Sequence, residues 1–339
     1  MRRSFLFSFF AILGLISESA AQDLRKAVRD ADAGLVKSIL ESGADVNRTY
    51  ENGSTSIFVA DKLEIVELLL AHGAKLDIRN AATIQSPIEN AAADFHRCRD
   101  DSQRREWKQI VDRLRKAGAE YTIDTAIYMN DIDFVRTKLE IDDAWVNDRK
   151  QAQSVPLKVA AQCGHVEICK LLLVHKADPD AFKECVGFSI MKYAAEHPAV
   201  VTLLIGHGAN LKRRITWRGG RSGYWIIGDE ASILHHVVSG GNPESVKLLL
   251  EAGIDPTVTD VDGQTPLHIA VRCERWNRGY ADEQTQDQIT SSFEQIVKLL
   301  IDNDASLAFT NSENQNPLQL AEELDSPQSI VDLLMARRK

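Results

Sequence analysis

The hexapeptide Thr265-Pro266-Leu267-His268-Ile269-Ala270 decides the fold class of this 339-residue chain. A threonine hydroxyl can cap the first turn of a helix, and proline fits the first helical position, where no backbone donor is needed. The hexapeptide therefore predicts a helix that starts at Pro266. Related segments recur along the chain: Ser56-Ile57-Phe58-Val59-Ala60, Ser86-Pro87-Ile88-Glu89-Asn90-Ala91, Val155-Pro156-Leu157-Lys158-Val159-Ala160 and Asn316-Pro317-Leu318-Gln319-Leu320-Ala321. Their recurrence indicates an internal repeat.

A leucine-rich helix that ends in a turn follows each of several start signals. Each of these helices contains an aliphatic triplet: Leu68-Leu69-Leu70, Leu171-Leu172-Leu173, Leu203-Leu204-Ile205, Leu248-Leu249-Leu250 or Leu299-Leu300-Ile301. Around one of them, Val246, Leu249 and Leu250 are spaced i, i+3, i+4. They form an apolar stripe that only a neighbouring repeat can cover. Gly253 ends this helix where a left-handed residue is favoured.

These units resemble the ankyrin repeat, whose helix pairs recur about every 33 residues. The segment 265–270 matches the family signature, and Gly164-His165-Val166-Glu167-Ile168-Cys169-Lys170-Leu171-Leu172-Leu173 is similar to the second helix of the family. The resemblance implies an all-α ankyrin-repeat solenoid of about nine helix-turn-helix repeats, with short β-hairpin fingers along one concave side. The predicted repeat domain is 22–339, with repeats at approximately 22–49, 50–80, 81–122, 123–152, 153–182, 183–229, 230–259, 260–311 and 312–339.

Residues 1–21 are predicted to form a secretory signal peptide. Arg2 and Arg3 precede an apolar run, 5–16, and Ser19-Ala20-Ala21 offers small residues for cleavage before Gln22. We expect a periplasmic or secreted mature protein that is not inserted in a membrane. Loss of two arginines and one glutamate changes its formal charge from −9 to −10. The alternatives are an uncleaved membrane anchor and, because Arg2-Arg3-Ser4-Phe5-Leu6 resembles the twin-arginine motif, export by that route.

Three insertions interrupt the repeats, and insertions form surfaces that the stack itself does not require. Residues 94–107 are dense in charge and are predicted to extend both helices of the third repeat as a solvated hairpin. Residues 273–292 lie between the helices of the eighth repeat. They are predicted to form a mobile loop anchored by Trp276, and a second contact site is the alternative.

The remaining insertion, 211–230, carries the candidate binding site as an enlarged finger. Gly219-Gly220 lies between 215–217 and 224–227, a pattern typical of a β-hairpin. Aromatic and arginine side chains are enriched at binding hot spots. The candidate partner-binding residues are Arg213, Arg214, Trp217, Arg218, Arg221, Tyr224 and Trp225. In the alternative interpretation, the tryptophans pack the hairpin on the stack and the cations stay solvated.

Charge and motifs favour protein binding over catalysis. The formal charge of −9 argues against a nucleic-acid partner. No Gly-x-Ser-x-Gly, phosphate-loop or His-Glu-x-x-His motif occurs, and the five cysteines have no metal-ligand spacing, so no catalytic, metal or cofactor site is predicted. The resemblance to ankyrin repeats implies that His235 and His268 form hydrogen bonds between repeats.

The predicted function is therefore non-enzymatic protein–protein interaction. An acidic partner is expected on the concave finger face, with the chain acting as a scaffold, a protective factor or a toxin-neutralising immunity protein. The alternative is a secreted effector or enzyme whose catalytic site is built from the inserts, with Cys98 or Cys273 as its nucleophile.

Overall fold

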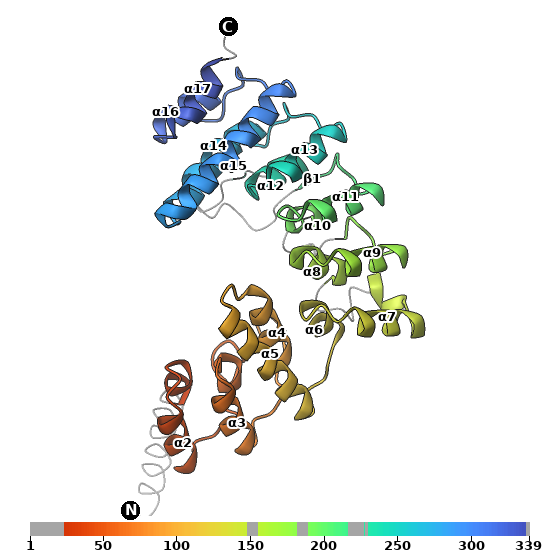
Figure 1. Cartoon of the computed structure of the whole chain (residues 1–339), viewed down its shortest axis with the longest axis vertical. Helices are drawn as coiled ribbons and strands as arrows, with labels where there is room; N and C mark the ends of the chain where they lie inside the picture. Colours follow the sequence, from red (N-terminus) through yellow and green to blue (C-terminus); the bar gives the residue numbers. More distant parts are fainter. Residues whose placement is uncertain (1–23, 148–154, 182–188, 216–226, 228–229, 337–339) are drawn as a thin grey trace, which may run out of the picture. The chain divides into compact units, whose positions relative to one another are not determined.

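The computed structural model describes residues 24–147, 155–181, 189–215, 227 and 230–336. The chain divides into two compact units, Met1–Thr137 and Lys138–Lys339 (Figure 1). Among the described residues, the regular secondary structure of both units is almost entirely helical, as the repeat pattern predicts. Among the described residues, no helix is both long enough and apolar enough to cross a membrane.

Unit 1 contains two layers of helices around an apolar core. Residues 24–29 are helical, and the further elements are α2 (Ala33–Glu41), η1 (Ser56–Val59), α3 (Leu63–Ala71), α4 (Pro87–Arg97), α5 (Asp101–Lys116), α6 (Ile123–Tyr128) and the start of α7 (Ile132–Ile141). The elements η1, α4 and α6 contact one another in sequence order, and α3 packs against α5. Between the layers, Ile65, Leu69, Ile88 and Leu114 are almost completely buried.

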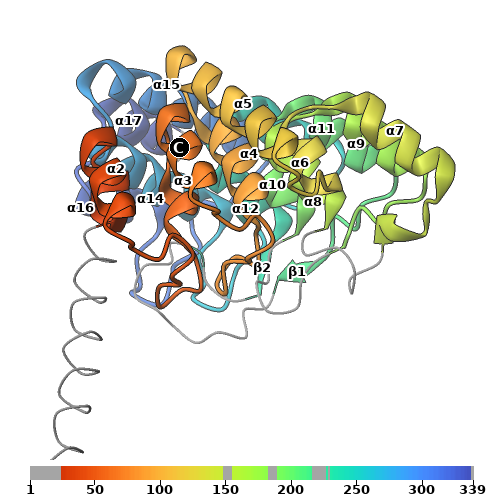
Figure 2. The ribbon, with the colours of Figure 1, turned by 90° about the horizontal axis from the view of Figure 1, so that it is seen from below.

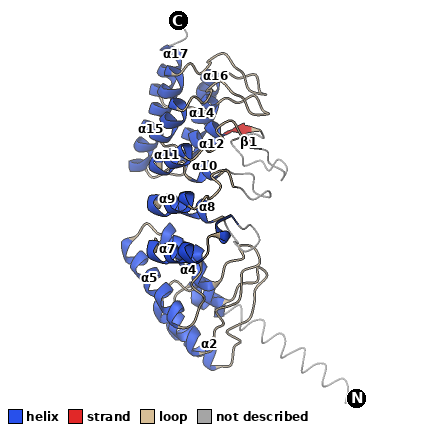
Figure 3. Cartoon of the chain, turned by 90° about the vertical axis from the view of Figure 1, so that its right-hand side faces the viewer, coloured by secondary structure: helices blue, strands red, loops and turns tan. Residues whose placement is uncertain are grey.

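Unit 2 stacks five helix pairs in the same manner. After η2 (Ala144–Asn147), the elements are α8 (Pro156–Cys163), α9 (Val166–Val174), α10 (Ile190–Tyr193), α11 (Pro198–Gly206), β1 (Arg214–Ile215), β2 (Ala231–Ser232), α12 (Ile233–Ser239), α13 (Pro243–Glu251), α14 (Pro266–Gly279), α15 (Glu283–Asp302), α16 (Pro317–Glu323) and α17 (Gln328–Ala336). Helices α8, α10, α12, α14 and α16 form an inner layer, and α9, α11, α13, α15 and α17 form an outer layer. Loops leave the inner layer on the side away from the outer layer (Figure 3).

The predicted start signals mark helix starts. Helix α14 begins at Pro266 with Thr265 as its N-cap, and α13 begins at Pro243, whose cap Asn242 accepts two backbone N–H groups. Gly253 follows α13 with a φ of +82°, in the left-handed region. Capping and turn residues therefore define the repeat locally, before any tertiary contact is made.

Asparagine side chains tie each of two turns to the next repeat. The Asn47 amide donates to the Gly73 carbonyl at 2.9 Å and accepts from the Lys75 N–H at 2.7 Å. Asn147 makes the same two bonds, at 2.7 and 2.8 Å, to the turn one repeat later. These bonds satisfy backbone groups that the turns expose and set the spacing between consecutive turns.

The first insertion forms a helical hairpin, as predicted. Helix α4 extends to Arg97 and the 16-residue α5 begins at Asp101. Ion pairs join α5 to α3 and its N-cap, Lys62. Glu106 lies 2.9 Å from Lys62, and Arg113 lies 2.6 Å from Glu67.

The prediction that the third insertion forms a mobile loop is wrong. Residues 283–302 form one 20-residue helix, α15, with Asp282 as its N-cap. Within this mostly polar segment, Ile289, Phe293 and Ile296 are spaced i, i+4, i+7 and form an apolar stripe on one face of the helix. Both Phe293 and Ile296 are buried. Packing against α14 and α13 selects the helix although the solvent-facing residues are polar.

A glycine substitution tests how tightly neighbouring loops of unit 2 pack. Gly263 has a φ of +70°, and a Cβ there would lie 2.9 Å from the Thr310 carbonyl oxygen of the next loop. We expect Gly263→Ala to lower the free energy of unfolding by roughly 2–3 kcal/mol, because backbone strain and a backbone clash add. Gly253→Ala is the matched control, since its φ is +82° but nothing lies within 4 Å. Equal losses in urea unfolding of the two variants would contradict close packing of the loops.

Candidate functional site

The candidate surface is formed by the loops that join each outer helix of unit 2 to the inner helix of the next repeat. We call the loops 177–181, 209–215, 254–264 and 305–315 the fingers. They emerge together on one side of the helices, where β1 and β2 also lie (Figure 2). Their geometry decides whether they form a fixed surface or separate loops.

Two buried histidines hold successive fingers in place. His235 and His268 occupy the third position after the N-caps of α12 and α14. Nδ1 of His235 accepts from the backbone N–H of Ser232 at 3.2 Å, while Nε2 is 2.9 Å from the Gln264 carbonyl of the next finger. A carbonyl only accepts, so Nε2 carries the proton and the imidazole is neutral. The predicted structural role of His235 is confirmed.

His268 repeats this arrangement one repeat later. Its Nδ1 lies 3.1 Å from the backbone nitrogen of Thr265, and its Nε2 lies 3.0 Å from the Gln315 carbonyl. The two imidazoles thus link three consecutive repeats through the same pair of bonds.

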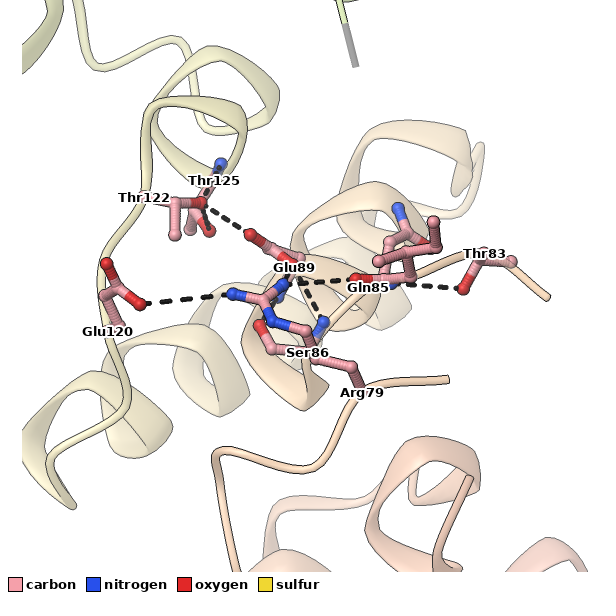
Figure 4. Close-up of polar contacts among 9 residues, drawn as sticks. Arg79, Thr83, Gln85, Ser86, Glu89, Glu120, Thr122 and Thr125 are labelled. Carbon is pink, nitrogen blue, oxygen red and sulfur yellow. Dashed lines mark hydrogen bonds and ion pairs between the residues drawn. The ribbon is translucent and has the colours of Figure 1, made fainter. Parts of the chain in front are cut away.

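In unit 1, a glutamate takes the corresponding position after the cap. Glu89 accepts from the Ser86 N–H at 2.8 Å and from the Thr122 hydroxyl, which caps the next inner helix, at 2.9 Å. Arg79 approaches this buried carboxylate at 3.0 Å and also reaches Glu120 at 4.0 Å (Figure 4). The arginine offsets the cost of burying the charge. Sequence reasoning missed this network, although Ser86-Pro87-Ile88-Glu89 was recognised as a start signal.

The two described arginines of the predicted site connect neighbouring fingers. Nη1 of Arg213 donates to the Asp180 carbonyl at 2.8 Å. Nη1 of Arg214 donates to the carbonyls of Glu230 at 2.9 Å and Thr259 at 2.6 Å. Both arginines therefore brace the base of the insertion. The other candidate residues lie outside the described residues and stay predictions: Trp217, Arg218, Arg221, Tyr224 and Trp225.

The described ends of the insertion pair as two short strands. Strands β1 and β2 are antiparallel, and Ile215 pairs with Ala231, not with a residue of 224–227. Most of the predicted hairpin falls on residues 216–226, outside the described part of the chain.

The braced fingers also carry exposed apolar side chains. Val261 is 59% exposed and Phe309 is 44% exposed, on adjacent fingers. A bond of 2.7 Å from the Ser312 N–H to the Asp262 carbonyl joins these two fingers. The loops thus form a continuous row that presents apolar and cationic groups together.

Comparison with known proteins identifies the repeats. Residues 123–215 match the family Ankyrin repeats (3 copies), residues 233–277 match Ankyrin repeats (many copies), and residues 262–312 match Ankyrin repeat. The chain contains ankyrin repeats. The all-α ankyrin architecture predicted from the sequence is confirmed.

Several curated proteins are similar over parts of the chain. Cyclin-dependent kinase 4 inhibitor B of Mus musculus is 26% identical over 168 residues, which is 49% of this chain and 100% of that protein. Ankyrin repeat and SOCS box protein 14 of Homo sapiens is 43% identical over 47 residues, 14% of this chain. The match spans only 8% of that protein, and a match to Dynein axonemal heavy chain 12 of Bos taurus spans 12% of that one. These similarities support a protein-interaction module.

Burial of histidines makes the stability of the ankyrin array sensitive to acid. Burial lowers the pKa of His235 to about 4 and that of His236 to about 3, from an ordinary 6.5. Between these values and pH 6.5 the unfolded chain binds more protons than the folded chain. The two neutral histidines therefore contribute their full stabilisation of the folded state above pH 6.5. This contribution is lost as the pH falls from 6.5 toward 4 for His235 and toward 3 for His236.

We expect His236→Ile to weaken this acid sensitivity, because Ile269 holds the equivalent place in the next repeat. Between pH 7 and pH 5, the variant should lose about 2 kcal/mol less unfolding free energy than the wild type. His207→Gln, at an exposed position, should keep the wild-type profile. The measurement is the unfolding free energy from urea titrations at pH 7 and at pH 5. An equal loss of this free energy in His236→Ile and in the wild type would contradict the prediction.

Proposed function

We propose that this chain is an exported, non-enzymatic ankyrin protein that binds a partner protein on the finger surface of unit 2. The observation that carries the proposal is the row of hydrogen bonds between fingers: Asn210 N–H to the Asp180 carboxylate at 2.8 Å, Arg214 to the Thr259 carbonyl at 2.6 Å, and Ser312 N–H to the Asp262 carbonyl at 2.7 Å. A surface fixed before binding loses little conformational entropy on association.

The chemistry of this surface supports a partner with acidic and apolar groups. Val261 and Phe309 supply exposed apolar area next to the insertion that carries Arg213 and Arg214. Aromatic and arginine side chains provide much of the binding energy at protein interfaces. Within this proposal, Trp217, Arg218, Arg221, Tyr224 and Trp225 extend the contact along the same insertion. The role is that of a scaffold, a protective factor or an immunity protein that neutralises a toxin.

Export rests on the N-terminal sequence, Arg2-Arg3 followed by the apolar run 5–16 and by Ser19-Ala20-Ala21. Its test is the N-terminus of protein recovered from the cell envelope or the medium. Mass spectrometry should find Gln22 as the first residue, and an intact Met1 in the membrane fraction would support the anchored alternative.

The described thiols do not favour the alternative of an enzyme built from the inserts. Cys273 is buried in α14, and burial raises its pKa to about 12. Only the thiolate is a good nucleophile, so Cys273 is poorly suited to attack near neutral pH. Cys98 is half-buried between α4 and α5, with its sulfur 3.5 Å from the Asp100 carbonyl.

Affinity capture from envelope extract tests the finger surface. We expect the wild type to retain a specific protein, and we expect Val261→Ser with Phe309→Ser, or Trp217→Ala with Trp225→Ala, to lower the amount bound at least about tenfold. Val174→Ser with Met335→Ser is the matched control, because both side chains are exposed and apolar but lie on outer-layer helices. Equal capture by finger variants and control would remove the fingers as the binding site.

A further inference from the structure

The paired helices α14 and α15 are much longer than their neighbours. Helix α14 has 14 residues, whereas the flanking inner helices α12 and α16 have seven each. At 1.5 Å per residue, the last two turns of α14 extend about 10 Å past the neighbouring helices. Figure 1 shows this hairpin reaching beyond α12 and α16. The end of the extension therefore lies past the neighbouring inner helices.

The extension is held rigidly in spite of its length. The Glu274 side chain is fully buried, and its Oε1 accepts from Arg278 Nε at 2.8 Å and from Thr290 Oγ1 at 3.0 Å. Nη2 of the same arginine donates to the Asp325 carbonyl in the α16–α17 turn at 3.2 Å. One guanidinium thus joins α14 to the adjoining repeat, while the glutamate joins it to α15.

A second contact fixes the extension from the preceding repeat. Gly241, in the α12–α13 turn, lies so close to Phe293 of α15 that an added Cβ would come within 3.3 Å of the ring. The Phe293 ring is buried by this contact. The base of the hairpin is therefore anchored to the repeats before and after it.

Two exposed aromatic side chains lie at the end of this rigid hairpin. Trp276 is 43% exposed and Tyr280 is 77% exposed, and their ring centroids are 5.1 Å apart. The exposed Arg275 places its guanidinium beside Gly279, 3.4 Å from the point where a Cβ would be. Arg275 forms no ion pair with any described residue, whereas Arg272 and Arg278 of the same helix pair with glutamates.

We propose that Arg275, Trp276 and Tyr280 form a second docking surface, separate from the fingers, for an acidic segment of a partner protein that also bears an apolar side chain. Guanidinium and indole N–H groups only donate hydrogen bonds, so carboxylates are their natural partners. The two rings supply apolar area beside those donors. The hairpin presents all three side chains with little entropy left to lose on binding.

Charge on the same hairpin narrows the choice of occupant. The start of α15, which follows Tyr280 in the sequence, carries Asp282 and Asp287, and these negative charges disfavour a broad anionic surface such as a membrane. Arg275 offers a single guanidinium, which suits one or two carboxylates of a partner segment and not an extended anionic surface.

Selection from a phage-displayed library of random peptides tests the proposal on the full chain. The library is first passed over the double variant Trp276→Ala with Tyr280→Ala, which removes peptides that bind elsewhere on the chain. The remaining peptides are then selected for binding to the wild type. We expect enrichment of Asp or Glu next to Leu, Ile or Phe. A synthetic peptide of the leading sequence should bind the double variant and Arg275→Glu at least about tenfold more weakly than the wild type. Exchange of its carboxylates for lysines should abolish binding.

Controls separate this surface from folding effects and from the fingers. The double variant should unfold at the wild-type temperature, because both side chains are exposed, and Met335→Ala, at a position 46% exposed, should bind the peptide normally. Val261→Ser with Phe309→Ser should also bind the peptide normally. This finger variant therefore shows whether a loss of binding comes from the fingers or from the Arg275, Trp276 and Tyr280 surface. Enrichment of basic or uncharged peptides would overturn the proposal. So would self-association, or binding to anionic phospholipid vesicles, that depends on Trp276.

Discussion

Within the described part of the chain, the apolar stripe of a helix pair is buried by neighbouring pairs, so each pair depends on the pairs beside it. At three inner helices, α4, α12 and α14, the residue in the third position after the cap turns this dependence into a specific contact. His235 and His268 donate to the carbonyls of Gln264 and Gln315 one repeat further on. In unit 1, Glu89 makes the corresponding link by accepting from the Thr122 hydroxyl. Stacking of apolar faces supplies the stability, and these polar links fix the distance and register between repeats.

The same links determine what the surface can do. Because each bond ends on a loop or on a helix cap, the fingers are placed by the helices beneath them. Arg213 and Arg214 extend this bracing to the base of the insertion, so their charges are held in place at the finger row. The long hairpin of α14 and α15 uses another device, a buried glutamate and an arginine that reaches the next turn. Both surfaces are rigid, and only the fingers belong to the repeat itself.

Local signals predicted the repeat well, and long-range contacts escaped prediction. Proline after a capping residue located the start of α14 at Pro266 because capping chemistry lies within a few residues. Helix α15 was missed because its apolar stripe is diluted by polar residues whose face meets solvent. The bracing roles of Arg213 and Arg214 leave no trace in the sequence, since their acceptors are backbone carbonyls. Arg79 was missed as the partner of Glu89 because only the fold shows that this carboxylate is buried.

Hydrogen exchange of His268→Ala tests most directly whether these links position the fingers. The finger 305–315 contains backbone bonds from the N–H groups of Asn311, Ser312 and Asn314. Loss of the imidazole should speed exchange of these three amides while the amides of α13 keep their protection. His207→Ala, whose ring bonds to its own helix at Leu203, should change none of them. Unchanged exchange at the finger in His268→Ala would contradict the claim that the histidine holds it in place.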